Sequence, residues 1–201
     1  MMLILAALLL GPGDLPVGAP ADPTFADESV FLSLRGGAWI CKDFKFEAVR
    51  TDSVQVESHD EALPSGALEF GVFLPEGLYV AAMAEASIGS HTNVGIAGLS
   101  IGYRERRAPD ASELLPDEGS AYLGGFYGRY EVDAEGFGDF DDAFGFRGGL
   151  SASWKLSRTL VASIAAEYRF VEFEYEGDVL SGDTHAGGSG VWVGAALDVR
   201  F

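Results

Sequence analysis

The chain has 201 residues, a length that suits one domain, and it carries 31 acidic against 13 basic side chains, a formal charge of −18. An acidic excess of this size argues against a nucleic-acid-binding protein, because phosphate contacts require a basic surface. The only cysteine, Cys41, excludes an intramolecular disulfide, so the folded chain must gain its stability from other interactions.

The first 21 residues have the features of a secretory signal peptide. Residues 3–10 form an apolar run that is too short for a membrane helix, which needs about 20 residues. Ala19-Pro20-Ala21 provides an A-x-A cleavage site, although no Lys or Arg precedes the run. We therefore predict a signal peptide over 1–21 and a short lead over 22–28. No later stretch is apolar enough for a membrane helix, so a mature chain that spans a membrane must do so with strands.

The rest of the chain alternates with period two, which is typical of strands that have one apolar and one polar face. In the last segment every second residue from Val191 to Phe201 is apolar, and the opposite face includes Asp198 and Arg200. Eight such segments occur, most of them near the roughly 9–11 residues of a tilted membrane strand. The predicted strands cover residues 29–40, 67–74, 78–88, 95–104, 121–132, 144–156, 159–170 and 190–201.

Short and long connections alternate between these strands. Pro75-Glu76-Gly77 and Ser157-Arg158 are tight turns, whereas the long polar connections are 41–66, 131–143 and 171–189. This arrangement is typical of outer-membrane barrels. Two connections depart from it: 89–93 is short for an outside loop, and 105–120 is long for a periplasmic turn. Residues 44–57 also alternate, which leaves open whether the first two strands extend beyond the membrane.

An eight-stranded barrel could also be a soluble, lipocalin-like binding protein with its apolar face inside. Two features favour a lipid-facing apolar side. Turning an arginine or lysine of the polar face toward lipid would cost about 2–4 kcal/mol near the bilayer midplane. Aromatic residues of the apolar face also gather at the strand ends, as in the interfacial belts of membrane proteins. The expected belts contain Tyr103, Tyr122, Trp154 and Phe201 on the turn side, and Tyr130, Phe144, Phe146, Tyr168 and Phe170 on the loop side.

Residues 29–201 resemble the small outer-membrane barrels of the OmpA and OmpX type. The most specific feature is the carboxy-terminal pattern Gly194-x-x-Leu197-x-Val199-x-Phe201, which is similar to the signal that the barrel-assembly machinery recognises. The resemblance implies an all-β fold, an eight-stranded antiparallel up-and-down transmembrane barrel with both termini in the periplasm. It implies contacts with outer-membrane lipids but no particular activity.

Ionisable residues on the inward face are expected to form ion pairs, because an unpaired charge inside a barrel is costly. Their arrangement has two interpretations: a gate or selectivity constriction, or a packed ion-pair core. The expected lumen residues are Arg35, Glu69, Glu85, Arg104, Arg129, Arg147, Lys155, Glu167, Arg169, Asp198 and Arg200.

The long connections hold most of the negative charge, with 17 acidic residues against three basic ones. Such a field attracts cations or basic partners. Asp139, Asp141 and Asp142 are weak candidates for a Ca²⁺ site, because the segment lacks the spacing of an EF-hand loop. We expect loosely bound divalent ions at most and predict no dedicated metal site.

Catalysis would require the histidines of the loops, His59, His91 and His185, with serine or acidic partners. No nucleophile motif, phosphate-binding loop or zinc spacing accompanies them, so we expect neither enzymatic activity nor a cofactor. The sequence thus predicts a non-enzymatic surface barrel with a structural or interaction role. An outer-leaflet enzyme that hydrolyses lipid or peptide is the alternative.

Overall fold

The structure, a computed structural model, describes residues 28–41, 45–50, 55–59, 62–90, 92–107, 115–132, 142–174, 180–181 and 185–201. The predicted signal peptide and nearly all of the predicted lead therefore lie outside the described residues.

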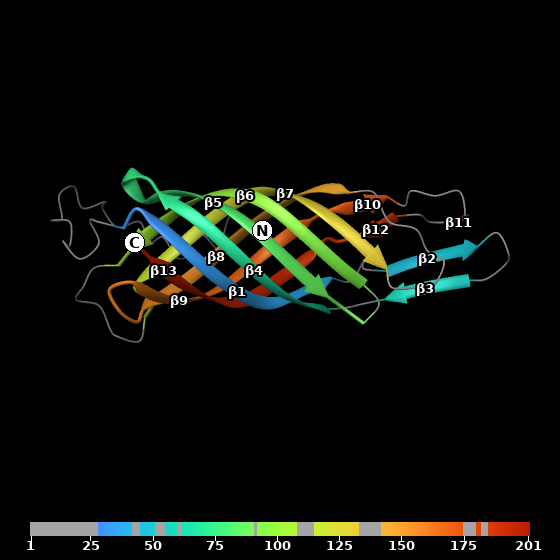
Figure 1. Cartoon of the computed structure of the whole chain (residues 1–201), viewed down its shortest axis with the longest axis horizontal. Helices are drawn as coiled ribbons and strands as arrows, with labels where there is room; N and C mark the ends of the chain where they lie inside the picture. The colour runs from blue at the N-terminus through green and yellow to red at the C-terminus, as the bar shows by residue number, and fades with distance from the viewer. Residues whose placement is uncertain are drawn as a thin grey trace.

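Eight antiparallel strands close into a barrel in the order β1-β13-β9-β8-β7-β6-β5-β4 (Figure 1). This confirms the predicted all-β, eight-stranded barrel, and every predicted strand overlaps one strand of the barrel. The bounds are β1 Val30–Cys41, β4 Ala62–Phe73, β5 Leu78–Ile88, β6 Thr92–Arg106, β7 Glu118–Val132, β8 Ala143–Lys155, β9 Leu160–Phe170 and β13 Gly190–Arg200.

The two ends of the barrel differ. At the end that we call the turn side, η1 (Pro75–Gly77) joins β4 to β5, with Glu76 and Gly77 at φ of 63° and 82°. Glycine suits this left-handed conformation. Phe201 lies at the same end, where its carbonyl oxygen accepts hydrogen bonds from the backbone N–H groups of Ser29 and Val30. No helix among the described residues is long and apolar enough to cross a bilayer.

At the opposite end, the loop side, short strands form two further sheets. β2 (Lys45–Arg50) pairs with β3 (Gln55–His59) and with β11 (Leu180–Ser181), and β10 (Glu172–Glu174) pairs with β12 (His185–Gly187). Figure 1 shows β2 and β3 reaching beyond the barrel wall. The alternation within residues 44–57 thus produces strands, but they pair outside the barrel sheet instead of prolonging its first two strands.

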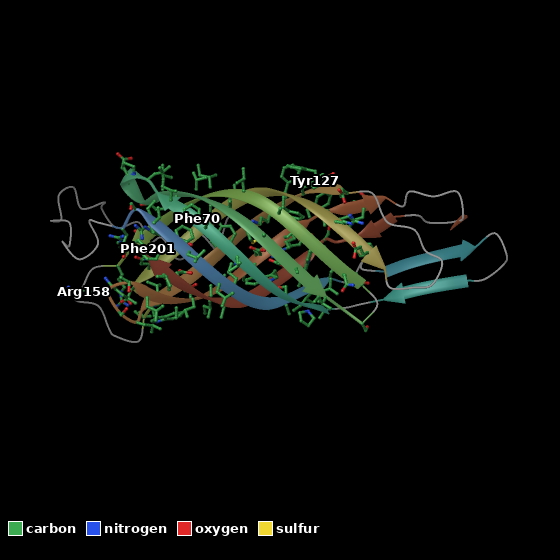
Figure 2. All side chains as sticks on the ribbon, in the orientation of Figure 1. Phe70, Tyr127, Arg158 and Phe201 are labelled. Carbon is green, nitrogen blue, oxygen red and sulfur yellow. The ribbon has the colours of Figure 1, made fainter. Side chains whose placement is uncertain are left out.

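The outer wall of the barrel is apolar. Leu34, Leu99 and Leu123 have exposed fractions of 62%, 64% and 71%. Figure 2 shows side chains such as Phe70 and Tyr127 projecting away from the barrel. Outward aromatic residues near the strand ends include Tyr103 and Phe201 on the turn side and Phe144, Phe146, Tyr168 and Phe170 on the loop side.

The predicted facing of strand 121–132 is wrong. Tyr122, Phe126 and Tyr130 point into the barrel, with exposed fractions of 9%, 1% and 0%, whereas Leu123 and Tyr127 point outward. Tyr122 and Tyr130 therefore do not belong to the aromatic belts. Glycines on both faces of this strand (Gly124, Gly125 and Gly128) make its two faces similar in hydrophobicity, so alternation alone could not distinguish inside from outside.

An apolar plug fills the loop-side half of the lumen. Its largest members are aromatic: the rings of Trp39 and Phe126 meet edge to face at 6.4 Å, and those of Tyr130 and Phe173 stack at 5.3 Å. A Cβ on Gly194 would collide with the Trp192 ring, so glycine makes room for the indole there. The plug consists of Trp39, Cys41, Leu63, Ala67, Met83, Val94, Ile96, Phe126, Tyr130, Val171, Phe173 and Trp192.

Truncating the centre of the plug should destabilise the barrel more than truncating its outer wall. Phe126→Ala leaves a cavity among close-packed rings, so we expect a loss of about 3–5 kcal/mol in unfolding free energy. Leu123→Ala, on the outer wall, should lower the unfolding free energy by less, because lipid or detergent fills the space left by the leucine side chain. Urea unfolding of the two variants in lipid vesicles measures the difference, and equal losses would contradict the packing described.

Candidate functional site

On the turn side of the plug, three arginines and three glutamates form what we call the central ion-pair layer. It consists of Arg35, Glu69, Glu85, Arg147, Glu167 and Arg169, contributed by β1, β4, β5, β8 and β9. The side chains of Arg147, Glu85, Glu167 and Arg169 are fully buried. Equal numbers of positive and negative groups make the layer neutral, which burial in a low-dielectric interior requires.

Glu167 is the hub of this layer. One carboxylate oxygen accepts a hydrogen bond of 2.6 Å from Arg169 Nε. The other accepts 2.6 Å and 3.2 Å hydrogen bonds from the Tyr122 hydroxyl and Arg35 Nη2, and lies 3.6 Å from Arg147 Nη1. Four strands are thereby tied together through one carboxylate: β1, β7, β8 and β9.

The remaining pairs have geometry that resists separation. Arg169 donates to both oxygens of Glu85 at 2.6 and 2.8 Å, the bidentate arrangement that gives arginine–carboxylate pairs their strength. Arg35 donates to Glu69 at 2.8 Å. The guanidinium carbons of Arg35 and Arg169 also lie 4.5 and 4.6 Å from the ring centroids of Trp192 and Trp39, so cation–π contacts join the ionic layer to the plug.

A second neutral cluster, the turn-side ion-pair layer, closes the opposite mouth. Arg200 donates to Glu118 at 2.8 Å, Arg104 donates to Glu28 at 2.9 Å, and Arg106 Nε lies 3.3 Å from Glu118. The Arg104 guanidinium also lies 3.5 Å from the ring centroid of Phe73. The layer consists of Glu28, Arg104, Arg106, Glu118, Asp198 and Arg200.

A cavity of about 80 Å³ lies between the two layers. This volume and the polar lining suit a few water molecules. Charged walls come from both layers, among them Arg35, Glu69, Glu118 and Arg200. Hydroxyl groups supply most of the remaining lining, from Ser33, Ser120, Ser151, Ser153, Ser163, Tyr79 and Tyr122.

The structure brings most of the predicted lumen residues together, with one clear exception. Arg129 points outward with its side chain 56% exposed and pairs with the exposed Glu131 at 3.0 Å. The prediction that Arg129 lines the lumen is therefore wrong, because its strand faces the other way. Lys155 is half-buried on the turn side, where its backbone N–H donates to Asp117.

Sequence reasoning missed three members of these clusters, Glu28, Arg106 and Glu118, and one hydrogen-bond partner of the central layer, Tyr122. Glu28, Arg106 and Glu118 fall just outside the predicted strands, so alternation did not assign them a face. Tyr122 was placed on the wrong face. The available signal was the excess of arginine on the inner face, which requires further carboxylates and hydroxyls as partners.

The loop candidates are largely untested by the structure. Asp139, Asp141 and His91 lie outside the described residues, and Asp142 is exposed. Among the described residues no group of three or more His, Cys, Asp or Glu could hold a metal ion. His59 lies in β3 and His185 in β12, but their side chains are not described.

Of the terminal pattern, Leu197 and Phe201 face outward with exposed fractions of 43% and 64%, and Gly194 packs against Trp192. Val199 also alternates onto the outer face of β13. Leu197, Val199 and Phe201 match the outward apolar face that the resemblance implies, and the role of the pattern in assembly stays a prediction.

Comparison with known proteins supports the fold. No protein-family model and no curated protein matches the chain. Among solved structures, it is similar to Neisserial surface protein A, with a TM-score of 0.52 and 15% identity over 86% of this chain and 96% of that one. It is also similar to the N-terminal β-barrel domain of Pseudomonas aeruginosa OprF, with a TM-score of 0.52 and 9% identity over 87% of this chain and 98% of that one.

The outer-membrane protein OprG from Pseudomonas aeruginosa gives a TM-score of 0.50 and 13% identity, over 87% of this chain and 98% of that one. At these identities the likeness concerns the fold alone. The chain thus has the fold of the small bacterial outer-membrane barrels, as its resemblance to the OmpA and OmpX type implied.

Removing one carboxylate from the central layer should destabilise the barrel strongly. Glu85→Gln leaves the buried Arg169 without its bidentate partner, and we expect a loss of about 3–5 kcal/mol in unfolding free energy. Glu131→Gln, which alters an exposed pair, should cost at most about 1 kcal/mol. Urea titration of both variants measures the contrast. A Glu85→Gln variant as stable as the parent would mean that the layer contributes little.

Proposed function

We propose that this protein is a non-enzymatic, non-conducting outer-membrane barrel that displays acidic connections on its loop side. Its turn side would face the periplasm. The observation that carries the proposal is the inverted distribution of side chains, with leucines such as Leu34 and Leu123 exposed on the wall and arginines such as Arg147 and Arg169 buried in the lumen.

The outer wall supports the membrane location. A soluble protein rarely exposes a contiguous apolar surface this large, because water penalises it. The band of exposed Leu, Ile and Val on all eight strands, with aromatic residues near both ends, suits a hydrocarbon layer bounded by two interfaces. A soluble lipocalin-like protein would have the opposite facing, with its leucines enclosed.

The lumen supports a closed barrel. Eight strands leave an interior that side chains can fill. Here the loop-side half is filled by the plug, whose residues Trp39, Leu63, Tyr130 and Phe173 have exposed fractions of 0%. An ion that crossed the barrel would have to displace these side chains and separate the pairs of the central layer.

The acidic connections support an interaction role for the loop side. With 17 acidic residues in the three long connections, this end attracts cations and basic partners. Divalent cations could bridge these carboxylates to the phosphates of lipopolysaccharide. We therefore propose a structural or interaction role at the cell surface.

Two measurements test the membrane location. After expression in a Gram-negative host the protein should appear in the outer-membrane fraction, and on a detergent gel the folded barrel should migrate differently before and after boiling. Recovery of the folded protein from the soluble fraction without detergent would refute the proposal.

A charge placed on the outer wall provides a finer test. Leu123→Lys should lower the unfolding free energy in lipid vesicles by about 2–4 kcal/mol if this position lies near the bilayer midplane. Glu105→Lys, at an exposed rim position, should change it by less than about 1 kcal/mol. Equal effects of the two substitutions would argue against a lipid-facing wall.

Conductance tests the closed lumen. In planar bilayers the parent protein should show no steady conductance, because the plug excludes hydrated ions. Phe126→Ala with Trp39→Ala should introduce intermittent openings by removing two facing rings. Steady channels in the parent protein would refute the non-conducting role.

A further inference from the structure

Two hollows meet at the turn-side mouth of the barrel. The inner one is the cavity between the two ion-pair layers, and the outer one is a groove beside η1. Phe73 and Arg104 line both hollows, Glu28 lines only the outer groove, and Glu118 and Arg200 line only the inner cavity. Phe73 and Arg104 therefore form the wall that the two hollows share, and Glu28 contacts Arg104 from the side of the outer groove.

Three arginines converge on one oxygen of the Glu28 carboxylate. Glu28 Oε2 accepts hydrogen bonds from Arg104 Nη1 at 2.9 Å, Arg106 Nη2 at 3.1 Å and Arg200 Nη1 at 3.4 Å. The side chain is only 7% exposed, and its second oxygen has no hydrogen-bond partner among the described residues. Convergent charged donors of this kind form a binding site for a carboxylate.

Glu28 differs from the other two carboxylates of the layer in its origin. Glu118 belongs to β7 and Asp198 to β13, whereas Glu28 precedes β1 and lies outside the barrel strands. The backbone is tied to the barrel from the next residue on, where Ser29 and Val30 donate to the Phe201 carbonyl. The barrel thus supplies the arginines, and the segment before it supplies the acid.

The charges show what the mouth would lack without this side chain. Without it, Arg104, Arg106 and Arg200 would keep Glu118 and Asp198 but would lose the one negative charge on which all three converge. One further monovalent anion replaces that charge. A dianion suits the place less well, because Glu118 and Asp198 would repel it.

We propose that the turn-side mouth is a carboxylate-binding site, occupied by the chain's own Glu28, which closes the inner cavity as a lid. A small monocarboxylate from solution should take the same place when the Glu28 side chain is removed. This inference concerns the folded barrel and does not depend on what the loop side binds.

The experiment measures access to the inner cavity in detergent micelles. Ser163, which lines the cavity and is 8% exposed, is replaced by cysteine in a Cys41→Ser background. The rate of modification by a small neutral methanethiosulfonate reports opening of the mouth. Glu28→Ala should raise this rate on the order of tenfold or more, because it removes hydrogen bonds between charged groups. Sodium acetate should return the rate toward that of the parent.

Matched controls distinguish opening of the mouth from effects of surface charge, ionic strength or loosening of the whole barrel. Glu105→Ala removes an exposed carboxylate from the same rim and should leave the rate unchanged. Sodium chloride at equal ionic strength should not substitute for acetate. In protein that retains native Cys41, buried at the loop side, Glu28→Ala should leave that thiol unreactive, which shows that the barrel is intact.

Three results would overturn the proposal: Glu28→Ala that reacts at the parent rate, fast reaction that acetate does not slow, or equal acceleration by Glu105→Ala. If Glu28→Ala also exposes Cys41, the modification rate at position 163 is measured in Glu28→Gln instead. This substitution keeps the volume of the side chain and removes its charge, so it tests the carboxylate alone. Its reaction at the parent rate would refute a role for the carboxylate.

Discussion

The pairing with a carboxylate of every buried arginine that the structure describes is the constraint on which this barrel depends. Because many apolar residues face outward and the plug fills only the loop-side half of the lumen, the strands cannot be held together by an ordinary hydrophobic core alone. The interior instead contains the Glu167 hub and the bidentate Arg169–Glu85 pair, which join strands that are distant in sequence. Breaking one pair leaves a buried charge, so the network stabilises the fold only as a complete set.

The lumen divides into levels with different physical properties. The plug excludes water at the loop side, the central layer lies beneath it, and the polar cavity separates that layer from the turn-side cluster. Cation–π contacts from Arg35 and Arg169 to the two tryptophans couple the plug to the central layer, so neither level is independent of the other.

The two ends offer different chemistry. The three long loop-side connections contain 17 acidic residues, and the turn side carries a compact, neutral cluster of arginines and carboxylates. We propose that the first attracts cations and basic partners and that the second accepts a single carboxylate. The fold allows this difference because closing the barrel needs only the strands, which leaves both mouths free to vary.

The resemblance to the small outer-membrane barrels implied the closed antiparallel architecture. Period-two alternation determined the strand count and the outward facing of seven strands, because each polar–apolar repeat has only one facing that avoids placing charges in lipid. It failed at β7, where glycines on both faces made the two registers nearly equivalent, so Arg129 was placed inside and Tyr122 outside. Tertiary structure alone decided the partner of each arginine, the aromatic plug and the presence of Glu28 in the turn-side ion-pair layer. Those contacts depend on which side chains meet across the lumen. The spacing of residues along one strand does not encode the distances between side chains of different strands.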